Sequence, residues 1–274
     1  MPLSAGEQPL TQERRGPRPL WTVRRFEEVT STNETILAAG EEGQPEWTVH
    51  LARSQTRGRG RGSHTWWSPS GGGLWMSVLL RPSTPPARLG GLALVAGAAV
   101  RSGLRDLGSR GVELYWPNDL YYRKRKLGGI LGEVRHGAPR QGGPAGPALL
   151  VALGIGLNID PLSIEPGGAE PPPGLRGSVA WLTETGCEER DPEAVAVAIL
   201  SRLEPLYRSF IAGASIPGLV QGALSGLDRE VRVRIPPGET FQARPVGIGE
   251  EGELIVDRGG ALEGLRAAEV DYGC

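Results

Sequence analysis

QTRGRGRGSHTWW, from Gln55 to Trp67, is the stretch that most restricts what this chain can be. It interleaves arginines with glycines and lies between two predicted strands, 48–53 and 74–80, of which the second is apolar on both faces, as a central strand is. Glycine lets backbone N–H groups approach a ligand, and guanidinium groups bind phosphate or carboxylate in a planar fork. The loop therefore predicts a mobile anion clamp, disordered until the anion arrives, with an indole to cover a purine ring.

Other interpretations of this loop stay open on its own residues: a solvated loop without a role, an Arg-Gly tether for nucleic acid, or a phosphate loop. A Walker A phosphate loop would continue with Gly-Lys-Ser/Thr, which does not follow here, and no acidic residue lies at the spacing of a Rossmann ribose anchor. An Arg-Gly tether usually lies in a long disordered tail, whereas this loop joins two core strands.

A second stretch, YWPNDLYYRKRKLGGIL from Tyr115 to Leu131, places a carboxylate at a tight turn and a lysine seven residues later. Strands are predicted at 112–116 and 126–135, on either side of Pro117-Asn118-Asp119. If these strands pair as a hairpin, Asp119 and Lys126 can point into one cleft. The alternative is ordinary turn chemistry beside a solvated, charged tip.

The rest of the chain is predicted to mix hairpins with helical crossovers. A strand at 21–29 precedes Ser31-Thr32-Asn33-Glu34, a Ser-x-x-Glu capping box that predicts a short helix ending near Gly40. The clearest helix begins with Asp191-Pro192-Glu193 and ends at Gly213. Further predicted elements are a buried helix at 88–107, a buried strand at 149–159, and short strands at 231–235, 241–248 and 253–256 that indicate a small β-barrel.

Length and charge limit the possible classes of protein. The chain has 274 residues, enough for one main domain with a small appendage, and we expect a disordered tail at 1–19, a main domain at 20–226 and a C-terminal domain at 227–274. Flexible surface loops are expected at 138–147 and 166–174. Thirty Lys and Arg against 31 Asp and Glu give a net charge of -1, which argues against bulk electrostatic binding to nucleic acid or an anionic membrane.

The cysteines and apolar runs predict a soluble protein in a reducing compartment. Cys187 and Cys274 give no disulfide framework and no metal-ligand spacing, so a cytoplasmic setting is expected. The longest apolar runs, 91–100 and 148–159, are shorter than the roughly 20 residues that cross a bilayer. The N-terminal residues lack the apolar core of a secretory signal.

Four motifs in order resemble the biotin protein ligase family. Their residues are Ser31-Thr32-Asn33, Gly58-Arg59-Gly60-Arg61 with Trp66-Trp67-Ser68-Pro69, Trp116-Pro117-Asn118-Asp119 with Lys126, and Gly154-Ile155-Gly156-Leu157-Asn158. The resemblance extends from about Trp21 to Tyr272. It implies an α+β fold: a mixed central β-sheet with flanking helices, like class II aminoacyl-tRNA synthetases, plus a small C-terminal SH3-like β-barrel.

The resemblance also implies roles for individual residues. The catalytic residues would be Lys126, Arg61 and Asp119, and the protein itself would hold no metal. Biotin would be bound by Ser31, Thr32, Asn33, Gln55, Gly58, Arg59, Lys126 and Gly129, and ATP by Arg59, Arg61, Trp66, Asn118, Asp119, Lys126 and Asn158. Three positions depart from the family pattern: Tyr115, where a lysine is common; Arg57, where a small residue is usual; and Gly62-Ser63-His64, where Arg-Gly-Arg is frequent.

The reaction implied is two-step transfer of biotin. ATP, with Mg²⁺, activates biotin as biotinyl-5′-AMP, and a lysine of a biotin carboxyl carrier domain then takes the biotinyl group. We expect a monomer or homodimer that binds neither membrane nor DNA, because the roughly 20 residues ahead of the first strand leave no room for the DNA-binding domain of the family's repressors.

Two alternatives stay open: a lipoate/octanoate-type protein ligase, which shares the fold class, and a structurally different, non-catalytic RNA- or DNA-binding protein. Ser70-Gly71-Gly72-Gly73 is similar to a motif of lipoate protein ligases, but the paired arginines before that motif and the His-Asp after it are absent from this sequence. A non-catalytic nucleic-acid-binding protein using the Arg-Gly loop is disfavoured by the near-neutral charge.

Overall fold

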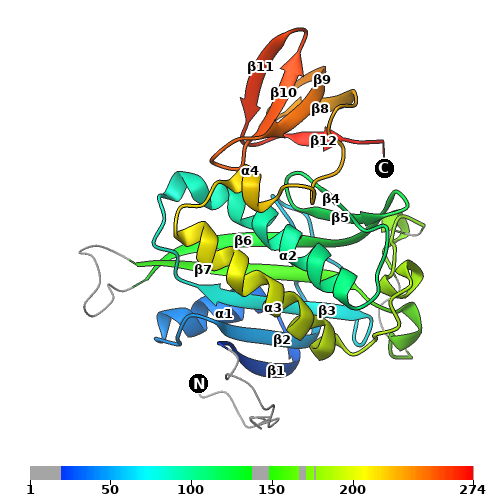
Figure 1. The fold of residues 1–274 in the computed structure, drawn as a ribbon. Helices are drawn as coiled ribbons and strands as arrows, with labels where there is room; N and C mark the ends of the chain where they lie inside the picture. Colours follow the sequence, from blue (N-terminus) through cyan, green and yellow to red (C-terminus); the bar gives the residue numbers. More distant parts are fainter. Residues whose placement is uncertain (1–19, 138–147, 167–170, 176, 274) are drawn as a thin grey trace. The chain divides into compact units, whose positions relative to one another are not determined.

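A computed structural model describes residues 20–137, 148–166, 171–175 and 177–273 (Figure 1). The predicted tail at 1–19, the loop at 138–147 and part of the loop at 166–174 lie outside the described residues. The chain divides into two compact units. The first comprises residues up to 82 with 131–156 and 161–170, and the second comprises 83–130, 157–160 and the residues from 171 onward.

A mixed seven-stranded sheet has the order β1-β2-β3-β7-β6-β5-β4. β1 is parallel to β2, and β2 is antiparallel to β3, so the predicted mixed sheet is confirmed. β3 is buried at every position, as its apolar sequence predicts. The strands are β1 (Thr22–Val29), β2 (Thr48–Gln55), β3 (Gly73–Leu80), β4 (Glu113–Tyr115), β5 (Asp119–Tyr122), β6 (Arg125–Gly137) and β7 (Ala148–Asn158).

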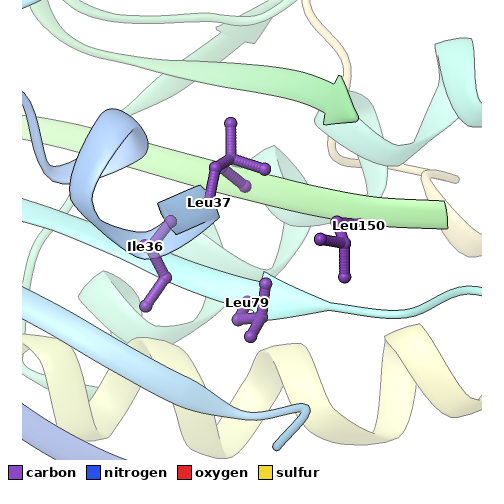
Figure 2. Packing of buried hydrophobic residues seen from close by; sticks show 5 residues of the cluster. Ile36, Leu37, Leu79 and Leu150 are labelled. Atoms are coloured by element: carbon purple, nitrogen blue, oxygen red, sulfur yellow. The ribbon is translucent and has the colours of Figure 1, made fainter. Parts of the chain in front are cut away.

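The core of the first unit forms where helix α1 (Thr32–Glu41) packs on β2 and β3. Ile36 and Leu37 of the helix are fully or almost fully buried with Leu79 of β3 and Leu150 of β7 (Figure 2). Gly40 allows the close approach, because a Cβ there would lie 2.9 Å from Leu79 Cδ1. This packing fixes the helix whose first residues carry the Ser-Thr-Asn motif.

The start of α1 is where predicted, but the predicted capping box is wrong. Ser31 is the N-cap residue with extended backbone, yet its side chain makes no capping hydrogen bond. The Glu34 carboxylate instead accepts a hydrogen bond of 3.0 Å from Thr30 Oγ1. The first amide of the helix, Thr32 N–H, donates to Gln55 Oε1 at 2.8 Å. A side chain from the end of β2 thus satisfies one of the four backbone donors that the first turn of a helix leaves without an intrahelical partner.

The second unit contains two long helices that lie side by side, α2 (Leu92–Asp106) and α3 (Pro192–Ile211) (Figure 1). Gly103 permits this contact, since a Cβ there would lie 2.8 Å from Ala198 O. α3 begins and ends as predicted: Asp191 accepts a hydrogen bond from Glu193 N–H, and Gly213 takes a φ of 89°. The predicted helix at 88–107 begins with a 3₁₀ turn, Pro86–Gly91. A short helix follows α3, namely α4 (Ile216–Leu219), and further 3₁₀ turns lie at Pro161–Ser163, Pro173–Leu175 and Leu182–Thr185.

The C-terminal part of the second unit is a five-stranded antiparallel sheet of order β11-β10-β9-β8-β12, consistent with the predicted SH3-like domain. Its described strands are not closed into a barrel. The sequence pattern missed its last two strands. The five are β8 (Val231–Ile235), β9 (Glu239–Ile248), β10 (Leu254–Arg258), β11 (Ala261–Leu265) and β12 (Glu269–Asp271). Over the described part of the chain, no helix combines the length and apolar character needed to cross a bilayer.

Candidate active site

The arginine-glycine loop of the first unit forms a hydrogen-bonded hairpin. Trp66 N–H donates to Gly58 O at 2.9 Å, and Gly60 N–H donates to His64 O at 2.8 Å. A Cβ at Gly58 would lie 2.4 Å from Trp66 O, so the return strand requires glycine there. The structure gives the loop this hairpin conformation, and its disorder before an anion arrives stays a prediction. Arg61 is exposed at the turn.

Gln55, at the end of β2, connects the loop to α1. Its Oε1 accepts hydrogen bonds from Thr32 N–H at 2.8 Å and from the Thr32 hydroxyl at 3.1 Å. Its Nε2 donates to Ser68 Oγ at 2.8 Å. Both ends of the Gln55 amide are thus oriented by the protein, next to Ser31 and Thr32, which are buried.

Asn33 connects the same helix to β3 and β6. Its side-chain Oδ1 lies 2.6 Å from the hydroxyl of Ser77, which also lies 2.7 Å from Thr32 Oγ1. Its Nδ2 donates to Glu133 Oε2 at 2.7 Å and to Leu131 O at 3.3 Å. The other oxygen of Glu133 pairs with Arg59 Nη1 at 3.2 Å. One network therefore joins Thr32, Asn33, Gln55 and Arg59.

The two glycines of the Gly-x-Gly-x-Asn strand β7 make room for other predicted site residues. A Cβ at Gly154 would lie 2.4 Å from Asn33 Oδ1, and a Cβ at Gly156 would lie 2.7 Å from Trp66 Nε1. The Trp66 indole therefore lies on bare backbone, with its edge toward Trp75 at a centroid distance of 6.4 Å. Both glycines position side chains of the first unit.

The second unit brings Lys126 and Asp119 together on the β5–β6 hairpin. Lys126 Nζ lies 2.8 Å from Asp119 Oδ1. The strands pair Tyr121 with Lys126 and Leu120 with Gly128, which leaves Leu127 as an extra residue in a β-bulge. Because side chains alternate along a strand and paired residues share a face, the pairing of Lys126 with Tyr121 puts Lys126 on the face of Asp119.

The backbone around this pair is held by two asparagines. Asn118 Nδ2 donates to Ile130 O at 2.7 Å, and Ile130 N–H donates back to Asn118 O at 2.9 Å. Asn158 Nδ2 donates to Lys126 O at 3.2 Å, and Lys126 also forms a parallel bridge with Val179. Both asparagine side chains are buried. Gly129, another predicted site residue, is the pairing partner of Asp119.

Tyr115 departs from the family pattern, and its surroundings explain what it does instead. Its hydroxyl accepts a hydrogen bond from Arg229 Nη2 at 2.6 Å and lies 3.2 Å from Glu113 Oε1. Its ring lies 4.6 Å from that of Tyr272. The neighbouring Trp116 donates from Nε1 to Gly252 O at 2.9 Å. Tyr115 and Trp116, which precede Asn118 and Asp119, therefore contact residues that flank the strands of the C-terminal sheet.

Sequence reasoning missed three members of these groups: Ser68, Ser77 and Glu133. Ser68 lies inside the quoted Trp-x-Ser-Pro ending, so its position gave a usable signal. Ser77 is a polar residue, fully buried, in an otherwise apolar strand, which is itself a sign of a required hydrogen bond. Glu133 lies two residues beyond the second quoted stretch.

Known proteins that are similar to this chain indicate its class. The model of the "Biotin/lipoate A/B protein ligase family" matches residues 26–146, which indicates the class of biotin and lipoate protein ligases. The "Bifunctional ligase/repressor BirA" of Bacillus subtilis is 30% identical over 247 residues, which cover 89% of this chain and 72% of that protein. The chain belongs to the biotin protein ligase family.

Two further relatives agree with this assignment. The "Biotin--[acetyl-CoA-carboxylase] ligase" of Mycobacterium tuberculosis is 29% identical over 246 residues, which cover 88% of this chain and 85% of that protein. A structure of biotin protein ligase from Aquifex aeolicus in complex with biotin and ATP has a TM-score of 0.72 and 25% identity, and the match covers 91% of this chain and 97% of that chain. The resemblance and the fold class drawn from the sequence are confirmed.

Proposed function

We propose that this protein is an ATP-dependent ligase that activates biotin as biotinyl-5′-AMP and transfers it to a lysine of a biotin carboxyl carrier domain. The observation that carries the proposal is the Lys126–Asp119 pair, a cation and a carboxylate 2.8 Å apart on one face of a hairpin. Family membership supports the substrates, because relatives are biotin ligases and one has been solved with biotin and ATP.

The Gln55 network suits the ureido end of biotin. A ureido group has a carbonyl acceptor and N–H donors, so it needs a site whose own donors and acceptors are fixed in direction. Gln55 and Thr32 are oriented by protein hydrogen bonds before any ligand binds. Ser31, Asn33, Gly58, Arg59, Lys126 and Gly129 complete the residues proposed for biotin.

The first step brings the biotin carboxylate to the α-phosphate of ATP, so two anions must meet. Lys126, Arg59 and Arg61 supply positive charge that reduces their repulsion and stabilises the crowded transition state. Holding the reactants in line contributes roughly 7 to 11 kcal/mol in well-oriented reactions. Trp66, Asn118 and Asn158 are proposed to serve ATP, with the Trp66 indole over the adenine.

Asp119 is proposed to act in the second step, as the base or the orienter for the incoming lysine amine. Mg²⁺ bound to ATP stays a prediction. Such an ion would enter with ATP, bound to the substrate phosphates.

The Lys126→Ala variant tests the assignment. We expect adenylation, measured as biotin-dependent pyrophosphate release, to fall at least about a hundredfold because a cation is removed from between two anions. Biotin affinity by calorimetry should weaken about tenfold or less. Lys124→Ala, on the same hairpin, is the control and should release pyrophosphate like the wild type. Near-normal release by Lys126→Ala would contradict the role given to Lys126.

Substrate choice separates the proposed function from its alternative. The protein should release pyrophosphate with biotin and not with lipoate or octanoate, whereas a lipoate-type ligase would show the reverse. Transfer is tested on a carrier domain of a biotin-dependent carboxylase, with a Lys→Arg change at the acceptor as the control. We also propose that the protein acts in the cytoplasm as a monomer or homodimer without binding DNA, which light scattering and a gel-shift assay can check.

A further inference from the structure

We infer that Glu133 is a positioning residue for the biotin end of the site: its carboxylate holds the Asn33 amide and the Arg59 guanidinium in fixed relation. The inference rests on the proposed function, since it assigns Glu133 to the same reaction. Nothing in the four family motifs includes this residue, and its role emerges from its contacts.

Each oxygen of the Glu133 carboxylate has its own donor. Oε2 accepts from Asn33 Nδ2 at 2.7 Å, and Oε1 lies 3.2 Å from Arg59 Nη1. The Glu133 side chain is 26% exposed and that of Arg59 is 40% exposed. Arg59 can therefore leave into solvent if its partner is lost, whereas Asn33, which is 4% exposed, cannot.

The Asn33 amide has one allowed orientation. Its Oδ1 faces the Ser77 hydroxyl at 2.6 Å, and its Nδ2 faces Glu133 and Leu131 O. Gly154 leaves it room, because a Cβ at that position would lie 2.4 Å from Asn33 Oδ1. Both polar atoms of Asn33 are used inside the protein. Asn33 therefore links the Glu133 carboxylate to α1 and, through Ser77, to Thr32.

A carboxylate is required at position 133 because both of its partners are donors. A glutamine has one acceptor oxygen and one NH₂ group, so in either orientation its NH₂ group faces a second donor. The buried Asn33 will keep the oxygen, since an unsatisfied buried amide costs more than an exposed guanidinium that returns to water. Glu133→Gln should therefore release Arg59 and leave α1 in place.

The experiment compares Glu133→Gln with Glu41→Gln. Glu41 is the matched control. Its carboxylate pairs at 3.1 Å with Arg135, which lies on β6 as Glu133 does, and the side chains of Glu41 and Arg135 are similarly exposed. For Glu133→Gln we expect the KM for biotin to rise about tenfold, with kcat within about twofold of the wild type and an unchanged melting temperature. Glu41→Gln should match the wild type in all three.

A double variant tests whether Glu133 acts through Arg59. In Arg59→Met the NH₂ group of a glutamine at position 133 no longer faces a cation, so adding Glu133→Gln should change the biotin KM by less than about twofold. An equal rise in both backgrounds would overturn the inference. So would an unchanged biotin KM in Glu133→Gln, a rise shared by Glu41→Gln, or a lower melting temperature without a change in KM. A wild-type protein without biotin-dependent pyrophosphate release would refute the proposed function itself.

Discussion

Gly154 and Gly156 show how single residues without side chains determine where functional side chains lie. They lie two residues apart on β7 and so share a face of the strand, and each leaves space that a neighbouring polar or aromatic group fills. The sequence pattern identified the Gly-x-Gly-x-Asn strand, but it gave no indication of which groups would occupy the space. That information depends on contacts with α1 and with the arginine-glycine loop, far away along the chain.

Gly156→Ala is expected to weaken ATP binding. The added Cβ would lie 2.7 Å from Trp66 Nε1 and 2.8 Å from Cε2, so the indole must shift from its place. If the indole stacks on adenine, the KM for ATP should rise about tenfold, a typical cost of losing one aromatic-base stack. Gly132→Ala is the control, because nothing lies within 4 Å of a Cβ there. Equal ATP KM values for both variants would contradict the stacking role.

Arg61→Gly is expected to release the reactive intermediate. Arg61 is exposed at the turn of the loop hairpin, where a bound phosphate would fix it. Without this anchor, biotinyl-AMP should leave sooner and biotinylate bystander amines, which can be measured on added albumin with a labelled avidin. No increase over the wild type would count against the role. The Gly62-Ser63-His64 departure makes this test informative, because the loop has fewer arginines here than is frequent in the family.

At the scale of elements, local signals predicted where the helices begin and end, but not the contacts at the start of α1 or the bulge in the β5–β6 hairpin. Asp191 and Gly213 end α3 as expected, because an N-cap and a left-handed C-terminal glycine are properties of a few adjacent residues. The capping box at Ser31 does not form, and the Glu34 carboxylate that it requires accepts a hydrogen bond from Thr30 Oγ1 instead. Leu127 carries no sign of a bulge, since an ordinary leucine can be paired or unpaired.

The β5–β6 turn can be made more stable without touching the site. Arg123 and Lys124 both have left-handed backbone, with φ values of 48° and 63°, as in a type I′ turn that favours Asn-Gly. The double change Arg123→Asn with Lys124→Gly should add about 1 kcal/mol of unfolding free energy in urea, net of the lost contact between Lys124 Nζ and Gly273 O. Lys124→Ala loses that contact without relieving the backbone, so it should not stabilise. A double variant no more stable than Lys124→Ala would refute the prediction.

At the scale of the whole molecule, the sequence predicted the mixed sheet, the helices and the C-terminal sheet, but not how Tyr115 is used. Its partners Arg229 and Tyr272 are more than a hundred residues away in sequence. No local sequence pattern predicts contacts between residues so far apart. The same holds for Glu133, whose partners Asn33 and Arg59 come from other elements.

His50 should make the stability of the whole protein depend on pH. Burial, with a smaller contribution from Arg24, lowers the pKa of His50 from 6.5 to about 4. Its Nδ1 lies 3.0 Å from Thr35 Oγ1, and its buried Nε2 has no hydrogen-bond partner among the described residues. Protonation would place an N–H in that position without an acceptor. The neutral form is therefore the one that the folded state stabilises.

The sign follows from the lowered pKa. The unfolded chain binds a proton at His50 below pH 6.5, while the folded chain does so only near pH 4, so this stabilisation is complete above about pH 6.5 and is lost as pH falls toward 4. The loss is about 3 kcal/mol at most. Urea unfolding at pH 7 and 4.5 should show a smaller decrease for His50→Leu than for the wild type. Equal decreases would exclude His50 as the cause.

The pairing of β5 with β6 follows a rule of parity. Lys126 faces Asp119 because it pairs with Tyr121, which lies two residues from Asp119 on the same face of β5. A shift of this register by one residue would turn the ammonium group to the opposite side of the sheet, while a shift of two would bring it back. Register shifts in this hairpin are therefore tolerable in pairs and disabling one at a time.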